Sequence, residues 1–208
     1  MSKDIVVPGE VVSQARKKLG AHVYIGAGAI RADVLGIKSE YEDAVSVVPL
    51  KGKYVPVEGD VIVGVVTEEK HAGYMVELNS FYPSFISKMD VREHLKPGTV
   101  ISAKVMRVDE LNEADISGVR VLYGGEIVQM SAVKVPRLIG KNASMLNMIQ
   151  RGTNAMLVVG RNGLVWVKGE KTRLALECIR RVERLAHMEH LTNDIQSFIE
   201  QQKQAGAR

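Results

Sequence analysis

VPRLIGKNASMLNMI, residues 135–149, is the most informative segment of this 208-residue chain for its fold. Its apolar residues recur at helical spacing in two short pieces, the first with Leu138 and Ile139, the second with Met145, Leu146, Met148 and Ile149. The residues between them, Gly140-Lys141-Asn142-Ala143, form a small-residue turn. We therefore predict two helices joined by a tight turn, where the backbone can approach a ligand closely and free helical N–H groups favour an anion.

Predicted strands lie on both sides of this helical pair. One strand is predicted for residues 126–132, and two more for residues 154–159 and 164–168. A helix is predicted from Lys171 to about His190, because Leu174, Ala175, Cys178, Ile179 and Val182 fall on one side of it. The polar residues 201–208 are predicted to be frayed.

This βααββα order resembles a type I KH domain, a module that grips single-stranded nucleic acid. In that family a GxxG loop clamps the backbone of about four nucleotides. The resemblance implies RNA contacts from Gly140, Lys141 and Asn142, aided by Arg137 and Arg151. Ala143 stands where the family has its second glycine. A simple turn between two amphipathic helices is the alternative interpretation.

Composition and charge indicate a globular chain with a basic C-terminal third. The hydrophobic content is 46% and the net charge is +4, with an excess of basic residues after residue 133 and of acidic residues in 53–125. That basic excess suits phosphate attraction. The sequence predicts no membrane helix and no secretory signal. Cys178, the single cysteine, is predicted to be a core thiol, and the cytoplasm is the expected compartment.

Residues 1–52 are predicted to form a small β-rich unit. Short apolar pieces at residues 5–7, 22–25, 30–35 and 45–50 are separated by glycine and polar residues, which is typical of hairpins. The string Gly26-Ala27-Gly28 lacks the third glycine of a dinucleotide loop, so no cofactor is predicted. Because so short a unit has little core of its own, we expect it to dock on a neighbour.

Residues 53–125 are predicted to form a five-stranded OB barrel. Strands are expected at residues 60–67, 74–78, 81–87, 100–108 and 115–122, with a helical turn at 91–95 before the fourth. The phrases VEGDVIVGVV, AGYMVELN and PGTVISAKVMRVDE resemble the S-one RNA-binding family, named from a ribosomal protein.

The barrel offers fewer base-stacking residues than that family does. Ala72, Met75 and Ser87 stand where the family tends to carry exposed aromatics and a histidine. Tyr74, Tyr82 and Phe85 are candidate substitutes, although aromatic residues in barrel strands are more often core. Three basic residues are predicted to line a path for phosphates, namely Lys88, Lys104 and Arg107.

A second glycine motif, Gly160-Arg161-Asn162-Gly163, separates the last two predicted strands. Asn-Gly is a strong hairpin signal because both residues accept positive φ. We predict a structural turn built on Gly160, Asn162 and Gly163, followed by a strand that buries Trp166 in the core.

The order of a β-rich unit (1–52), an S-one barrel (53–125) and one KH domain (126–208) is specific. It is similar to the KH-containing RNA-binding cap subunits of the archaeal exosome, of the ribosomal-RNA-processing type. VVPLKGKYVPVEGDVIVGVV, VKVPRLIGKNASMLNMI and VVGRNGLVWVKGE carry the match. The resemblance implies a cap on a ring of RNase-PH-like subunits, shared with other cap subunits, that passes the 3′ end of single-stranded RNA inward. It implies that the GxNG turn serves packing.

The sequence predicts no catalytic site, because no nucleophile–base pair or metal-ligand spacing carries a recognisable signature. His187 and His190 are three residues apart without a clear third ligand, so no metal is predicted. Two alternatives stay open. One is a transcription elongation factor, a family that carries a second KH copy for which this chain lacks room; the other is a structural cap with weak RNA contact.

Overall fold

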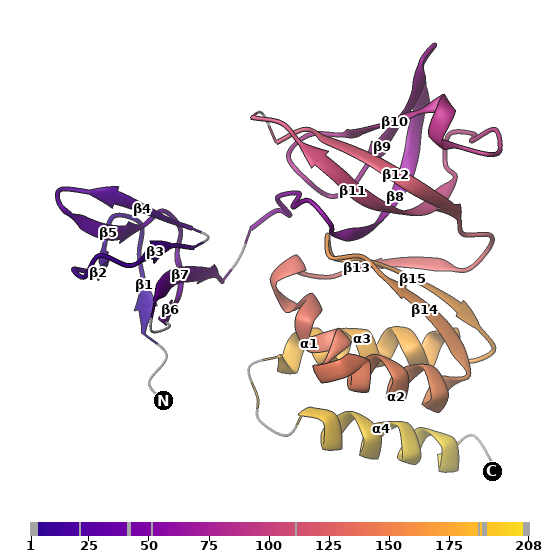
Figure 1. The fold of residues 1–208 in the computed structure, drawn as a ribbon. Coiled ribbons are helices and arrows are strands. Elements are labelled where there is room, and N and C mark those ends of the chain that lie inside the picture. Colours follow the sequence, from indigo (N-terminus) through magenta and orange to yellow (C-terminus); the bar gives the residue numbers. More distant parts are fainter. Residues whose placement is uncertain are drawn as a thin grey trace. The chain divides into compact units, whose positions relative to one another are not determined.

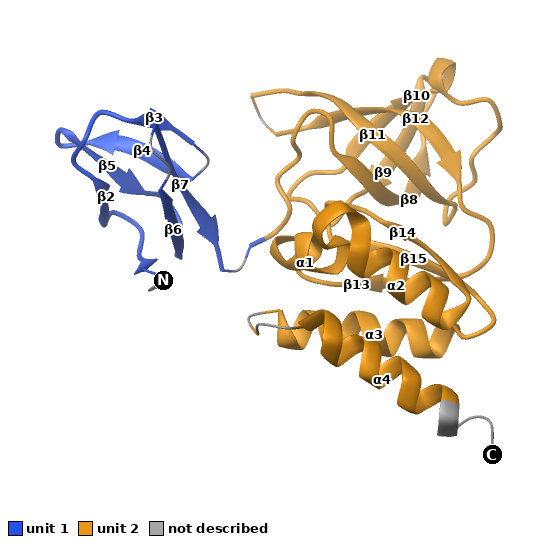
Figure 2. Cartoon of the chain, turned by 60° about the horizontal axis from the view of Figure 1, so that its bottom comes forward, with its two compact units in different colours: residues 1–52 blue, residues 53–208 orange. Residues whose placement is uncertain are grey.

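The computed structural model describes residues 4–20, 22–40, 43–50, 52–110, 112–186, 188 and 191–205. The chain divides into two compact units, residues 1–52 and residues 53–208 (Figure 2). The fold class is the predicted one: a β-rich N-terminal region, a closed five-stranded barrel and a KH fold. The boundary between residues 125 and 126 stays a prediction, since barrel and KH fold belong to one compact unit.

The first unit consists of two small sheets (Figure 1). One has the strand order β1-β6-β7-β3 and the other β2-β5-β4. Both contribute to one core of Val6, Val12, Ile30, Ala32, Val45 and Val47. The strands are β1 (Ile5–Val6), β2 (Val11–Ser13), β3 (Lys18–Leu19), β4 (Val23–Gly26), β5 (Ala29–Ala32), β6 (Gly36–Glu40) and β7 (Ala44–Pro49).

The barrel closes in the order β10-β12-β11-β8-β9. Its strands are β8 (Val61–Glu69), β9 (Gly73–Glu77), β10 (Ser84–Ser87), β11 (Val100–Val108) and β12 (Ala114–Val121). Closure comes from a parallel bridge of β10 with β12, at Phe85 and Asp115, while the other neighbours are antiparallel. The helical turn predicted at residues 91–95 is wrong: a 3-10 turn, η1 (Lys88–Asp90), precedes that segment, capped by the Ser87 hydroxyl.

The KH fold has an antiparallel sheet with the order β13-β15-β14 and helices on one face. Its strands are β13 (Glu126–Gln129), β14 (Ala155–Val159) and β15 (Leu164–Gly169), and its helices are α1 (Val135–Ile139), α2 (Ser144–Thr153) and α3 (Thr172–Leu185). The strand predicted for residues 126–132 is shorter than expected, because a 3-10 turn, η2 (Ala132–Lys134), leads into α1.

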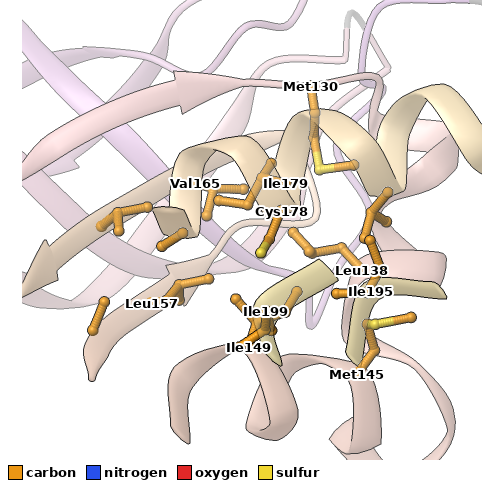
Figure 3. Packing of buried hydrophobic residues seen from close by; sticks show 14 of the residues in the cluster. Met130, Leu138, Met145, Ile149, Leu157, Val165, Cys178, Ile179, Ile195 and Ile199 are labelled. Atoms are coloured by element: carbon orange, nitrogen blue, oxygen red, sulfur yellow. The ribbon is translucent and has the colours of Figure 1, made fainter. Parts of the chain in front are cut away.

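Side-chain alternation along β15 explains why the run Leu164–Val167 is wholly apolar. Val165 and Val167 point into the helix-covered core, together with Leu138, Ile149 and Cys178 (Figure 3). Leu164 and Trp166 belong instead to a cluster with Val63 of β8 and Leu122. The strand is therefore buried on both faces, and Trp166 packs between sheet and barrel.

A further helix, α4 (Leu191–Ala205), was missing from the predicted elements. It packs on α2 and α3 and buries Leu191, Ile195 and Ile199, which recur every four residues. Arg181 of α3 holds it with two hydrogen bonds to Asp194, at 2.8 and 3.0 Å. The predicted frayed tail is thus wrong for residues 201–205, which are helical. His187 and His190 lie outside the described residues.

The turn at residues 160–163 joins the KH sheet to the barrel. β9 pairs with β8 only from Val65 onward, so the peptide groups of Val63 have no partner in β9. The buried amide of Asn162 supplies one: its Nδ2 donates to the carbonyls of Val63 (2.6 Å) and Leu78 (2.7 Å), and its Oδ1 accepts from Val63 N–H (3.2 Å). A side-chain amide thus replaces a strand residue.

Neither glycine of this turn leaves room for a Cβ. A Cβ on Gly160 would lie 2.1 Å from Asn162 Oδ1, and one on Gly163 would lie 2.2 Å from the carbonyl oxygen of Met130. Gly163 has a φ of +85°, whereas Asn162 is not among the described residues with positive φ. The predicted turn with positive φ at both residues is therefore wrong at Asn162, whose role is hydrogen bonding.

We predict that Asn162→Ala lowers the free energy of unfolding of residues 53–208 by about 2–4 kcal/mol, because it leaves two carbonyls and one N–H buried without partners. Denaturant unfolding of the full chain measures the loss, and hydrogen exchange should show that the Val63 amide loses protection. Asn147→Ala, at an exposed position on α2, is the control and should change stability by no more than about 0.5 kcal/mol. Equal stability of the two variants, with Val63 still protected, would contradict the assigned role.

Candidate nucleic-acid interface

The loop between α1 and α2 has an unusual backbone. Gly140 has φ 73° and ψ 175°, and the next residues form a 3-10 turn, η3 (Lys141–Ala143). Within it Asn142 and Ala143 both adopt left-handed conformations, with φ of 52° and 59°. This conformation costs a non-glycine residue roughly 1–2 kcal/mol. Ala143 therefore adopts a left-handed conformation that a glycine would adopt without this cost.

Packing makes glycine necessary at the first position of this loop. A Cβ on Gly140 would lie 2.9 Å from both the backbone nitrogen and the Cβ of Met145, a buried residue in the first turn of α2. Its φ of 73° would also strain any other residue. Gly140 thus lets α2 start directly behind the loop, so that the free N–H groups of the helix lie close to it.

Three of the predicted RNA-binding residues come together at this loop. Arg137, Gly140 and Lys141 line one hollow of about 320 Å³, which the first residues of α4 close on one side. Arg137, Lys141 and Asn142 are exposed. Arg151 is exposed further along α2 and lines a separate hollow between α2 and α4. α4, which the sequence reasoning missed, therefore helps to shape both hollows.

The charged side chains in the sequence on both sides of the loop are all positive. Between Glu126 and Glu170 the sequence contains no acidic residue, while it carries Lys134, Arg137, Lys141, Arg151, Arg161 and Lys168. Of these, Lys134 is directed to the carbonyl of Glu183 and Arg161 lies 3.5 Å from Asp60. Arg137 and Lys141 instead line the hollow beside the loop, where they suit a phosphate.

The three basic barrel residues predicted to contact phosphates differ in whether an acidic side chain lies next to them. Lys88 forms an ion pair with Glu69 at 2.8 Å and lies over the ring of Tyr74. A hydrogen bond from Lys88 lowers the pKa of Glu69, and the same bond raises the pKa of Lys88. Lys104 and Arg107 are both exposed on β11, where Arg107 stands opposite Asp115 in the strand register. Lys88 and Arg107 thus have acidic neighbours.

Tyr74 is a wrong candidate for base stacking. Its side chain belongs to the barrel core with only 3% exposed, and its hydroxyl lies 3.3 Å from Nδ1 of His94. A buried ring offers no face to a nucleobase. Phe81 and Tyr82, in contrast, are 62% and 49% exposed. The sequence reasoning placed Phe81 in a strand, whereas β10 begins only at Ser84, after Pro83.

No described helix is long and apolar enough to cross a membrane. The described residues also contain no group of three or more His, Cys, Asp or Glu side chains that could hold a metal ion.

Comparison with known proteins shows similarity over most of the chain. A family model described as KH domain matches residues 125–173. Exosome complex component Rrp4 of Methanobrevibacter smithii is 35% identical over 94% of this chain and 70% of its own length. The protein of the same name from Thermococcus kodakarensis is 33% identical over 95% of this chain and 85% of its own length. A crystal structure of a putative exosome complex RNA-binding protein aligns with a TM-score of 0.67 and 29% identity, over 74% of this chain and 99% of that one.

Proposed function

The chain belongs to the Rrp4 family of exosome complex components, and on that premise we propose that it captures single-stranded RNA for an exosome and guides the 3′ end into a ring of RNase-PH-like subunits. The observation that carries the RNA-binding part is the exposed loop Gly140–Ala143. The loop has a left-handed backbone and lies at the N-terminus of α2. The hollow beside it is lined by the cations Arg137 and Lys141.

The chemistry of this loop suits the backbone of RNA more than its bases. Lysine and arginine neutralise phosphates, and the N–H groups at the start of α2 favour an anion. Neither interaction depends on base identity, so capture is expected to tolerate many sequences. Arg151 extends the positive charge along α2.

Degradation is assigned to other subunits in this proposal. Burial raises the pKa of the Cys178 thiol to about 12, so it is not an available nucleophile. The exosome names of the relatives favour an exosome role over that of a transcription elongation factor. Action in the cytoplasm, beside other cap subunits, is part of the proposal.

We predict that Lys141→Ala weakens binding of single-stranded RNA about five-fold at 0.1 M salt, because one phosphate contact is lost. The slope of log affinity against log salt should become shallower by about 0.7. Fluorescence anisotropy with the full chain measures both quantities. Ala143→Gly keeps the charge and relieves the left-handed alanine, so it should bind at least as well as the original chain.

Lys96→Ala is the matched control, since Lys96 is an exposed cation in a barrel turn. It should leave affinity and slope unchanged. If Lys141→Ala behaves like Lys96→Ala, the loop is idle and RNA is held elsewhere on the chain. If the unmodified chain binds no RNA at all, the proposed function itself is wrong.

Residues 1–52 have the surface of a docking unit. Among the described residues of this unit, six apolar side chains are buried in the core, whereas nine large apolar ones are at least 36% exposed: Ile5, Val7, Val11, Leu19, Tyr24, Ile25, Leu35, Val48 and Leu50. So much exposed apolar surface on so small a unit indicates a protein partner. We assign it to the RNase-PH-like ring that the family resemblance implies.

We predict that Ile25→Glu, at the most exposed of these side chains, lowers affinity for the ring at least about ten-fold, since a charge would be desolvated in an apolar contact. Co-purification of the full chain with the ring subunits gives the readout. Met89→Glu, at a 94% exposed barrel position, is the control and should retain binding. Retention of Ile25→Glu on the ring would contradict docking through this surface.

A further inference from the structure

Two adjacent aromatic rings stand exposed between β9 and β10. Phe81 is 62% and Tyr82 49% exposed, although the other large apolar side chains nearby, Tyr54, Tyr74 and Leu78, are buried in the barrel core. The Nζ of Lys53 lies over one face of the Phe81 ring, 5.6 Å from its centroid. An exposed ring with a cation over one face has the elements of a nucleotide contact, an aromatic surface for a base and a positive charge for a phosphate.

The backbone beneath these rings is held from several directions. Ser80 is buried, pairs with Tyr54 in an isolated bridge, and donates its hydroxyl to the carbonyl of Tyr82. Asn79 has a φ of 59°, and its amide N–H is bonded to the Glu77 carboxylate at 2.7 Å. The rings are therefore presented by an ordered turn, which lowers the entropic cost of binding.

The same turn is tied to the KH fold. Asn79 Nδ2 donates to the carbonyl of Asn162 at 3.3 Å, and Gln129 Nε2 donates to Asn79 Oδ1 at 3.0 Å. The exposed rings and the loop Gly140–Ala143 thus belong to one compact unit in which barrel and KH sheet are bonded together. An RNA strand held by the loop would meet a second site of fixed position.

We propose that Phe81, Tyr82 and Lys53 form a second RNA contact, in which Phe81 stacks on a base and Lys53 neutralises a neighbouring phosphate. This inference rests on the proposed function, because it needs the chain to bind single-stranded RNA. The ammonium of Lys53 over the ring favours RNA over an apolar protein partner as occupant. Phe81 would thus give the barrel a base contact that the buried Tyr74 does not provide.

The test is Phe81→Leu in the full chain, which keeps apolar bulk but removes the aromatic face. Affinity for a single-stranded RNA is expected to fall about 5- to 160-fold, the range for one stacked base. The salt slope should not change, since no charge is lost. Phe81→Trp should restore binding. Tyr123→Leu, which removes a 63% exposed ring elsewhere in this unit, is the control and should bind normally.

An RNA of the same length without bases gives the second readout. The original chain and Phe81→Leu should bind it equally, because stacking is absent from both complexes. Lys53→Ala should make the salt slope shallower by about 0.7 for either RNA.

The outcomes separate this inference from the proposed function. If the original chain binds RNA and Phe81→Leu binds it equally well, the second contact is wrong and the RNA-binding function stands. If Phe81→Leu no longer co-purifies with the RNase-PH-like subunits but still binds RNA, the two aromatic side chains form a protein contact and the inference is overturned. If the original chain binds no RNA, both proposals fail.

Discussion

The structure of residues 53–208 depends on one buried side-chain amide. Asn162 reaches from the KH sheet to the open edge of β8 and bonds both peptide groups of Val63 and the carbonyl of Leu78. In a dry interface an amide can satisfy these groups because it has a donor and an acceptor in the same plane, as a peptide does. The apolar contact of Trp166, Leu164, Val63 and Leu122 surrounds this bond network and keeps water out.

This constraint gives the two glycine motifs of the KH fold opposite roles. Gly160–Gly163 is buried against the barrel except for Arg161, which lies beside Asp60 at the edge of the contact. Gly140–Ala143 is partly or fully exposed and has cations around it. The hydrogen bonds of the first motif are made within the protein, and the proposed RNA capture is therefore assigned to the second. An assembly that must hold a moving strand gains from such a rigid base, because binding energy is not lost in ordering two domains.

The sequence predicted the elements with strong periodicity and missed those without it. The barrel strands, α1, α2 and α3 follow from apolar patterns, and β11 matches its predicted bounds, Val100–Val108. α4 was missed because its sequence, LTNDIQSFIEQQKQA, is mostly polar. Three of its described side chains are buried, and their four-residue spacing forms an apolar stripe that packs on α2 and α3. The candidate Tyr74 was wrong because the closed barrel encloses its ring, and closure is a tertiary property that also leaves Phe81 exposed. The hydrogen bonds between the Asn162 side chain and Val63 join residues 99 positions apart in the sequence, and no local pattern reveals such a contact.

In the proposed complex, the loop Gly140–Ala143 holds RNA on a unit whose barrel and KH fold do not move against each other. Hydrogen–deuterium exchange of the full chain, with and without a single-stranded RNA, reports on both parts of this proposal. RNA is expected to slow exchange of the amides of residues 140–144 and to leave the already protected Val63 amide unchanged. Slowed exchange at residues 160–163 with none at the loop, or release of the Val63 amide when RNA binds, would contradict it.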